Sequence, residues 1–135
     1  MAEDDIAIVQ RALEAFNRGG IEATAEFGHP ELEFQGAGLV LPREPMRGLE
    51  QAIAQLRMYQ ANFEHLRYTP LEFLRCGDAV VVPAHFTGKG PSGAELQLVL
   101  TLAFWLREGK IARVRIFMSR EAALKELPEP VTAEA

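Results

Sequence analysis

Cysteine, long apolar runs and basic segments are all scarce in this sequence. The single cysteine, Cys76, cannot form an intramolecular disulfide. The apolar run at residues 98–106 is interrupted by Thr101 and ends at Arg107, far short of the roughly 20 residues that a membrane helix needs. The chain opens with acidic residues rather than with a basic stretch followed by an apolar one, which is unlike a secretory signal. We therefore expect a cytoplasmic protein with no membrane-spanning segment.

Positive charge and metal-ligand patterns are scarce as well. Lysine and arginine number 14 against 19 aspartates and glutamates, a net charge of −5 with no basic patch to reverse it, which excludes a nucleic-acid partner. His29, His65 and His85 have no carboxylate or second histidine at metal-ligand spacing. We expect neither a metal nor another cofactor. What remains is a globular composition, 48% hydrophobic and 24% charged, in a chain long enough for one domain with its own core.

Helical periodicity dominates the first half of the chain. Apolar residues recur at three-to-four spacing behind Asp4 and Asp5, and Gly19 and Gly20 end the run. A later stretch combines glycine and proline with apolar residues, which is typical of a flap over an opening. The expected elements are helices at 6–16 and 21–27, a brief strand at 32–35, the flap at 36–48 and the longest helix of the chain at 49–63.

The second half alternates between apolar and polar residues at period two, with glycine-containing turns between the alternating segments. The expected elements are antiparallel strands at 66–74, 80–86, 96–106 and 111–118 and a closing helix at 120–127. Helices followed by a long meander predict an α+β fold, in which a curved antiparallel sheet wraps around helices. We expect one domain over residues 1–127 and a flexible C-terminal tail over residues 128–135.

Short landmarks along the chain make this prediction more specific. Each is little more than a helix end, a turn or a hairpin, but together they follow one another from about residue 6 to 125. Their order and spacing resemble those of SnoaL-like proteins, a branch of the nuclear-transport-factor-2-like superfamily, which implies a cone-shaped α+β fold. The landmarks are VQRALEAFNRGG, FGHPELEFQG, MRGLEQAI, CGDAVVV and LREGKIARVRIFMSREAAL.

The resemblance does not by itself name an activity, because the superfamily houses isomerases, dehydratases, epoxide hydrolases, polyketide cyclases and non-catalytic binders. Its ketosteroid isomerases use a helix tyrosine, a strand aspartate base and a protonated aspartic acid, and the matching positions here are Ala12, Gln35 and Leu102. Its cyclases place an acidic residue at the end of the last strand, where this chain has Met118 and Ser119. None of these functional groups is present at the matching positions.

A pocket between the sheet and the helices is the shared feature that the resemblance implies. Strand alternation predicts that the even-numbered positions face it and that its wall is apolar. Gln35 and Tyr59, with Gln60 beside it, are the polar candidates, since an amide and a phenol orient a carbonyl but make a weak acid–base pair. The expected ligand-binding residues are Gln35, Ile53, Leu56, Tyr59, Phe63, Val82, Ala84, Phe86, Leu100, Leu102, Val114, Ile116 and Met118.

The opposite sheet face mixes bulky apolar and polar residues, Trp105 among them. Tryptophan and arginine are enriched at protein contacts, and an exposed apolar patch favours a covering partner. We therefore expect a homodimer through this outward face. Its expected residues are Val81, His85, Thr87, Gln97, Val99, Thr101, Trp105, Arg113 and Arg115.

Two functions from different classes remain open at this point. The first is a binding protein of unassigned activity whose apolar pocket holds a small hydrophobic, carbonyl-bearing molecule. The second is an enzyme, an isomerase or polyketide-cyclase-type lyase that acts without metal on an enolisable carbonyl, with Gln35 and Tyr59 as the catalytic candidates. A third possibility is a dimer whose core is simply filled.

Overall fold

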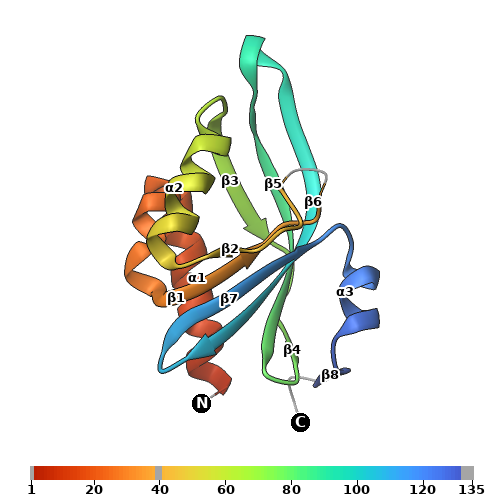
Figure 1. Ribbon diagram of the computed structural model, residues 1–135. Coiled ribbons are helices and arrows are strands. Elements are labelled where there is room, and N and C mark those ends of the chain that lie inside the picture. The colour runs from red at the N-terminus through yellow and green to blue at the C-terminus, as the bar shows by residue number, and fades with distance from the viewer. Residues whose placement is uncertain (1, 39–40, 132–135) are drawn as a thin grey trace.

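Three helical segments lie together on one side of a curved sheet in the computed structural model, which describes residues 2–38 and 41–131 (Figure 1). These three are α1 (Ala2–Gly19), the 3₁₀ helix η1 (Ile21–Phe27) and α2 (Leu49–Gln60); the other described helical segments are the 3₁₀ turn η2 (Pro91–Gly93) and α3 (Arg120–Glu126). The strands are β1 (Gly28–Gln35), β2 (Met46–Arg47), β3 (Glu64–Pro70), β4 (Leu74–Cys76), β5 (Ala79–Lys89), β6 (Glu95–Arg107), β7 (Lys110–Phe117) and β8 (Pro130–Val131).

The sheet is built around the long hairpin of β5 and β6, whose pairing runs from Ala79 opposite Trp105 to Lys89 opposite Glu95. The strand order is β2-β1-β7-β6-β5-β4-β8, and β3 also pairs with β5. Neighbouring strands are antiparallel, as predicted, except that β1 runs parallel to β7. The α+β fold with a curved sheet wrapped around helices is therefore confirmed, with one parallel pair added to it.

The strand predicted over residues 66–74 is two strands. β3 pairs with the C-terminal half of β5, ending with Pro70 opposite Ala84, and β4 pairs with the N-terminal half of β5, beginning with Leu74 opposite Val81. A proline lacks the N–H that would continue the ladder, so a strand interrupted at Pro70 is physically reasonable. One long partner strand thus holds two short ones.

Helix length and the end of the chain also differ from expectation. The longest described helix is α1 with 18 residues rather than α2 with 12, because the chain leaves α2 at Gln60 and enters β3. Within the stretch predicted as a flap, β2 pairs with β1; residues 39–40 of that stretch lie outside the described residues. Within the segment predicted as a flexible tail, β8 pairs with β4. Residues 132–135 of that segment also lie outside the described residues.

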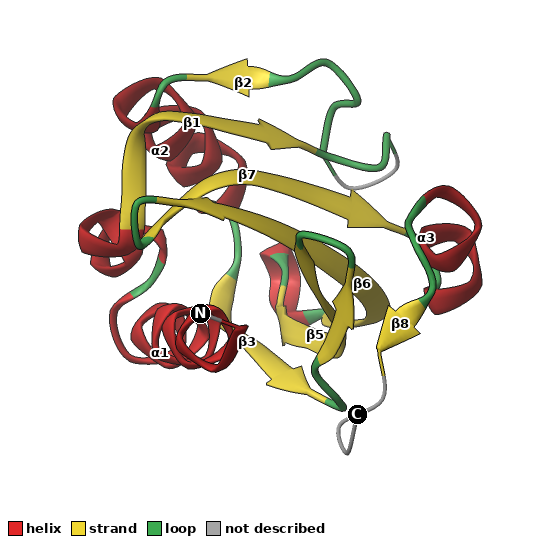
Figure 2. Cartoon of the chain, turned by 90° about the horizontal axis from the view of Figure 1, so that it is seen from below, coloured by secondary structure: helices red, strands yellow, loops and turns green. Residues whose placement is uncertain are grey.

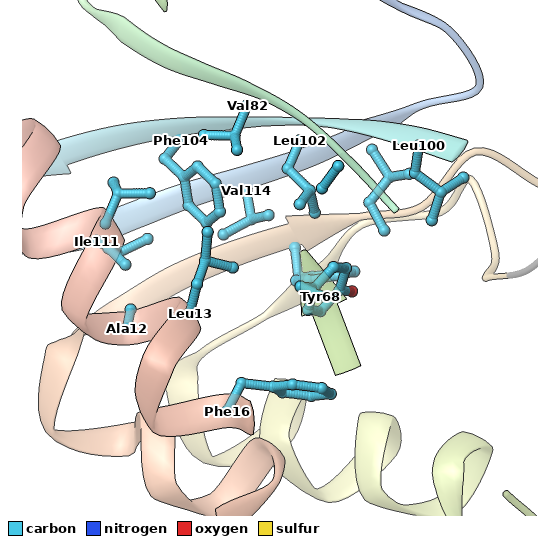
Figure 3. Close-up of a cluster of buried hydrophobic side chains, with 14 of the residues drawn as sticks. Ala12, Leu13, Phe16, Tyr68, Val82, Leu100, Leu102, Phe104, Ile111 and Val114 are labelled. Carbon is cyan, nitrogen blue, oxygen red and sulfur yellow. The ribbon is translucent and has the colours of Figure 1, made fainter. Parts of the chain in front are cut away.

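The inner face of the sheet carries the main core, as the period-two alternation predicts. Val80, Val82 and Ala84 of β5 are fully buried, and α1 supplies the facing apolar side chains. Figure 3 shows Leu13 reaching from α1 toward the sheet and the ring of Phe16 lying below Tyr68 in this view. Among the described residues, no helix is long and apolar enough to cross a bilayer.

The outer face is only partly open, because α3 packs on it (Figures 1 and 2). Ser119 caps α3 by accepting a 3.0 Å hydrogen bond from the Ala122 N–H. Val81 and Thr101, both expected on an accessible face, have no exposed surface, whereas Val99 is 53% exposed. The second core cluster, beneath α3, consists of Cys76, Ala79, Val81, Ala103, Phe117 and Ala123.

Candidate functional site

Between the helices and the inner face of the sheet lies a cavity of about 90 Å³, which we call the inner cavity. Its walls come from α1, η1 and α2 on one side and from β1, β3, β6 and β7 on the other. Figure 3 shows part of this wall. The lining residues are Ala12, Leu13, Phe16, Ile21, Thr24, Gly28, Leu32, Phe34, Leu41, Leu49, Ala52, Ile53, Leu56, Gln60, Tyr68, Leu102, Phe104, Ile111 and Val114.

A second cavity of about 300 Å³, the outer cavity, lies toward the C-terminal end of α2. Its walls include side chains with more surface exposure than those of the inner cavity, such as Tyr59 at 45%. The two cavities share Leu41, Gln60 and Tyr68, so these three residues stand at their junction. The lining residues are Leu41, Tyr59, Gln60, Phe63, Leu66, Tyr68, Phe86, Leu96, Leu100 and Ile116.

Tyr68 carries the polar group of greatest chemical interest in this apolar lining. The residue is 8% exposed, and the hydrogen bonds of Tyr68 within residues 2–38 and 41–131 are made by its backbone, not by its phenol. Burial raises the pKa of Tyr68 well above its ordinary value of 10.0, because the charged phenolate is poorly solvated there. At neutral pH the phenol is therefore protonated and able to donate a hydrogen bond.

The other polar groups of the lining either already donate a hydrogen bond or are less buried than Tyr68. The Thr24 hydroxyl already donates to the Ile21 carbonyl at 2.6 Å. The Gln60 amide is half-buried at the junction of the cavities and can both donate and accept. Tyr59 lies at the exposed rim of the outer cavity. Tyr68 and Gln60 are thus the groups best placed to orient a bound molecule.

Aromatic packing and backbone contacts position the Tyr68 ring. It stacks on Phe86 of β5, with ring centroids 4.5 Å apart, and it meets Phe16 of α1 at 5.0 Å. Aromatic pairs at these separations add to the stabilisation from burial alone. The carboxamide of Asn17 also contacts the backbone of Tyr68. Contacts from β5 and from α1 therefore both hold Tyr68 in place.

Most of the expected ligand-binding residues lie on one of the two cavities. Those on the inner cavity are Ile53, Leu56, Leu102 and Val114, and those on the outer cavity are Tyr59, Phe63, Phe86, Leu100 and Ile116. Val82 and Ala84 line neither cavity and are fully buried in the core between the strands and helices. Met118 also lines neither cavity and is 39% exposed just beyond the end of β7.

Gln35 is not among the lining residues of either cavity. Leu32 and Phe34 of β1 are buried and face the inner cavity. Successive residues of a strand point to opposite faces, so Gln35 belongs to the other face, where it pairs in register with Arg115 of β7. The resemblance to ketosteroid isomerases predicted Gln35 on the pocket from its position in the sequence, but that position does not determine which face of β1 the side chain occupies.

Sequence reasoning missed Tyr68 and the α1 wall of the inner cavity. The alternation of Leu66 and Tyr68 with Arg67 and Thr69 was the available signal for Tyr68, since it places an aromatic hydroxyl on the apolar side of a strand. The helical spacing of Leu13 and its neighbours predicts a core-facing stripe. That spacing does not distinguish a packed stripe from a cavity wall.

The remaining chemical candidates lie away from the cavities. His29 accepts a hydrogen bond from the Glu31 N–H at 3.0 Å, and its Nε2 lies 3.4 Å from Glu108. Burial raises the pKa of the Cys76 thiol, and nearby Arg120 opposes that shift. Among the described residues there is no cluster of three His, Cys, Asp or Glu side chains suited to a metal, and neither cavity has a carboxylate in its described lining.

Comparison with known proteins agrees with the fold. A structure of a nuclear-transport-factor-2-like protein of unknown function from Burkholderia pseudomallei K96243 superposes with a TM-score of 0.76 at 17% identity, covering 90% of this chain and 95% of the other. A candidate SnoaL-like polyketide cyclase from Jannaschia sp. CCS1 gives 0.74 at 23% identity, covering 96% and 94%. IdmH, a candidate polyketide cyclase from Streptomyces antibioticus, gives 0.69 at 20% identity, covering 89% and 95%.

At the level of sequence, no curated protein matches the chain significantly. The family model that does match is the SnoaL-like domain, over residues 9–114. That span begins within α1 and ends within β7, and it includes the described lining residues of both cavities except Ile116. The chain belongs to the SnoaL-like domain family.

Proposed function

We propose that this SnoaL-like protein binds a small hydrophobic molecule carrying a carbonyl group, which accepts a hydrogen bond from the Tyr68 phenol. The observation that carries the proposal is a buried, protonated phenol at the junction of two apolar cavities. The outer cavity, at about 300 Å³, has the size at which small-molecule pockets begin. Gln60 at the same junction is a second group that would orient the ligand.

Apolar contact supplies most of the affinity in this proposal, and the phenol supplies selectivity. Burying apolar ligand surface is worth roughly 25 cal/mol per Å². One hydrogen bond contributes about 0.5–1.5 kcal/mol net, which corresponds to at most about a tenfold change in affinity. A ketone and its hydrocarbon analogue should therefore both bind, the ketone more tightly.

The test is a comparison of α-tetralone with tetralin, measured by displacement of a solvatochromic dye after any bound compound has been removed. In Tyr68→Phe the affinity for tetralone should fall by up to about tenfold, while the affinity for tetralin stays unchanged. Tyr59→Phe is the matched control, because it removes the same hydroxyl from the exposed rim. Failure of both compounds to bind, or equal loss of both in Tyr68→Phe, would contradict the proposal.

An isomerase or cyclase acting on an enolisable carbonyl is the second candidate. Its support is the same phenol, because a preorganised donor stabilises the oxyanion of a developing enolate. The similar structures include candidate polyketide cyclases. Gln60 cannot accept the substrate proton at neutral pH, so this candidate needs a base from the substrate or from water. Protein-dependent exchange of the α-protons of tetralone in heavy water, followed by NMR, would support it.

We further propose that the protein is a cytoplasmic homodimer joined through the part of the outer sheet face that α3 leaves open. Val99 is 53% exposed on this face, beside the exposed His85 opposite it on β5. Trp105 is half-buried and stacks beneath Arg113, with the guanidinium carbon 4.5 Å from the ring centroid. The free Cys76 thiol is compatible with a reducing compartment.

A further inference from the structure

The side chain of Asn17, in the last turn of α1, is paired with the backbone of Tyr68 in β3. Its amide nitrogen donates to the Tyr68 carbonyl at 2.8 Å, and its amide oxygen accepts from the Tyr68 N–H at 2.8 Å. Both bonds join residues 51 positions apart in the chain. A single carboxamide thus satisfies both backbone groups of one strand residue.

This contact reproduces the pairing of two residues in an antiparallel ladder. In such a ladder, hydrogen-bonded residues exchange both N–H···O bonds, and the N–H and C=O of one residue point to the same side. Because those groups of Tyr68 point to Asn17, they point away from its register partner Phe86 on β5. Asn17 therefore occupies the edge of β3 as a neighbouring strand residue would.

The same geometry explains the stacking of the Tyr68 ring. Opposed residues that do not exchange hydrogen bonds lie closer together in their side chains than those that do. The rings of Tyr68 and Phe86 stack with centroids 4.5 Å apart and an interplanar angle of 26°. The backbone orientation held by Asn17 is thus the orientation that brings the phenol against β5.

Few other backbone contacts hold this part of β3. Among the described strands, β3 pairs with β5 alone, and its register with β5 shifts between Glu64 and Arg67. His65, within the shifted stretch, has a left-handed backbone with φ of 59°, which is uncommon outside glycine. The regular ladder begins immediately before Tyr68, so Asn17 contacts β3 at the start of its regular pairing with β5.

We propose that Asn17 is a positioning residue that fixes the Tyr68 phenol at the junction of the two cavities and thereby sets the preference for carbonyl-bearing ligands. The proposal rests on the proposed function for its ligand but not for its geometry. It differs from a general structural role in one measurable respect. Loss of a purely structural contact weakens all ligands alike, whereas loss of positioning removes the difference between a ketone and its hydrocarbon analogue.

Two replacements probe the contact in different ways. Asn17→Asp keeps the shape and the acceptor for the Tyr68 N–H but cannot donate to the carbonyl when ionised. Asn17→Leu removes both bonds. Arg18→Ala is the matched control, because Arg18 is the exposed neighbour of Asn17 in the same turn and has no side-chain contact with Tyr68 among the described residues.

The first measurement needs no ligand. The protein has two tyrosines, so ¹⁹F NMR of protein labelled with 3-fluorotyrosine gives two signals, which Tyr59→Phe assigns. We expect one sharp Tyr68 signal in the wild type and in Arg18→Ala. In Asn17→Asp the signal should broaden or split, and it should titrate at lower pH as the phenol gains access to water. An unchanged Tyr68 signal in a folded Asn17→Asp protein would overturn the positioning role.

The second measurement uses α-tetralone and tetralin. The wild type should prefer tetralone by up to about tenfold, and in the Asn17 variants the ratio should approach one. Adding Tyr68→Phe to an Asn17 variant should then change the ratio no further, since the coupled pair is already broken. A wild-type preference retained in both Asn17 variants would refute the proposal.

The two measurements separate the possible failures. If the wild type binds neither compound, the proposed function fails, and the fluorine signals still decide whether Asn17 positions Tyr68. If Asn17→Leu does not fold, Asn17→Asp carries both measurements, because it matches asparagine in size.

Discussion

Whether the inner cavity is open or filled can be decided by enlarging one alanine in its wall. Ala12 of α1 lines this cavity and is 4% exposed. Cavities in proteins cost about 24 cal/mol per Å³. For a cavity of about 90 Å³, a side chain that fills it would recover at most about 2 kcal/mol. We therefore expect Ala12→Leu to leave the free energy of unfolding unchanged or to raise it by up to that amount.

Ala84→Leu is the matched control, because Ala84 is fully buried in the same core but lines neither cavity. Adding the same atoms to a packed site forces strain and costs about 1–3 kcal/mol. The two variants should thus differ in sign. Urea unfolding at constant slope gives both values from the transition midpoints. Any bound compound must be removed first, because a ligand of the native state adds its own stabilisation.

Equal destabilisation of the two variants would refute this reasoning. It would mean that the space beside Ala12 cannot accept a leucine side chain, and the filled-core interpretation would then be favoured. Destabilisation of Ala84→Leu alone would support an open inner cavity.

Three further predictions concern other parts of the molecule. Val99→Glu should convert the dimer to a monomer in sedimentation at micromolar concentration, because Val99 is exposed on the outer face and lies outside the cluster beneath α3; a wild-type monomer would contradict the dimer. Burial raises the pKa of the Cys76 thiol above its ordinary value of 9.0. The contribution of this thiol to stability is therefore complete below that pH and is lost as the pH rises above it. In urea unfolding at alkaline pH, Cys76→Ala should lose stability less steeply with rising pH than the wild type does. No conjugated enone should form from a β,γ-unsaturated ketosteroid, since the described lining of both cavities has no carboxylate to move the proton; absorbance at isomerase-like rates would disprove this.

The sequence predicted the parts of the fold that depend on local periodicity. Alternation placed Val80 and Val82 on the core face of β5, and helical spacing located α1 and α2. It could not predict that α3 would cover Val81, because the pattern of a short helix does not state which sheet face it packs on. The parallel pairing of β1 with β7 was equally inaccessible, since it joins distant segments with no local signal.

The candidate site was predictable only in its apolar part. Residues such as Leu102 and Val114 follow from alternation and do line the inner cavity. The polar groups depend on strand faces and on contacts between elements, so Gln35 was assigned to the cavity wall and Tyr68 was overlooked. The Asn17 contact depends on the approach of α1 to the edge of β3, which follows from tertiary packing alone.

The parallel pair of β1 and β7 has a consequence for the order of folding. The hairpin of β5 and β6 joins residues close in sequence, whereas β1 pairs Gly28 with Ile111 and Gln35 with Arg115. Contacts between distant residues carry a larger loop-closure entropy and form more slowly. The hairpin should therefore form before β1 docks, and the inner cavity is complete only after that late step. Contacts made after the transition state mainly slow unfolding, so a ligand of these cavities should lengthen the life of the folded chain without hastening its formation.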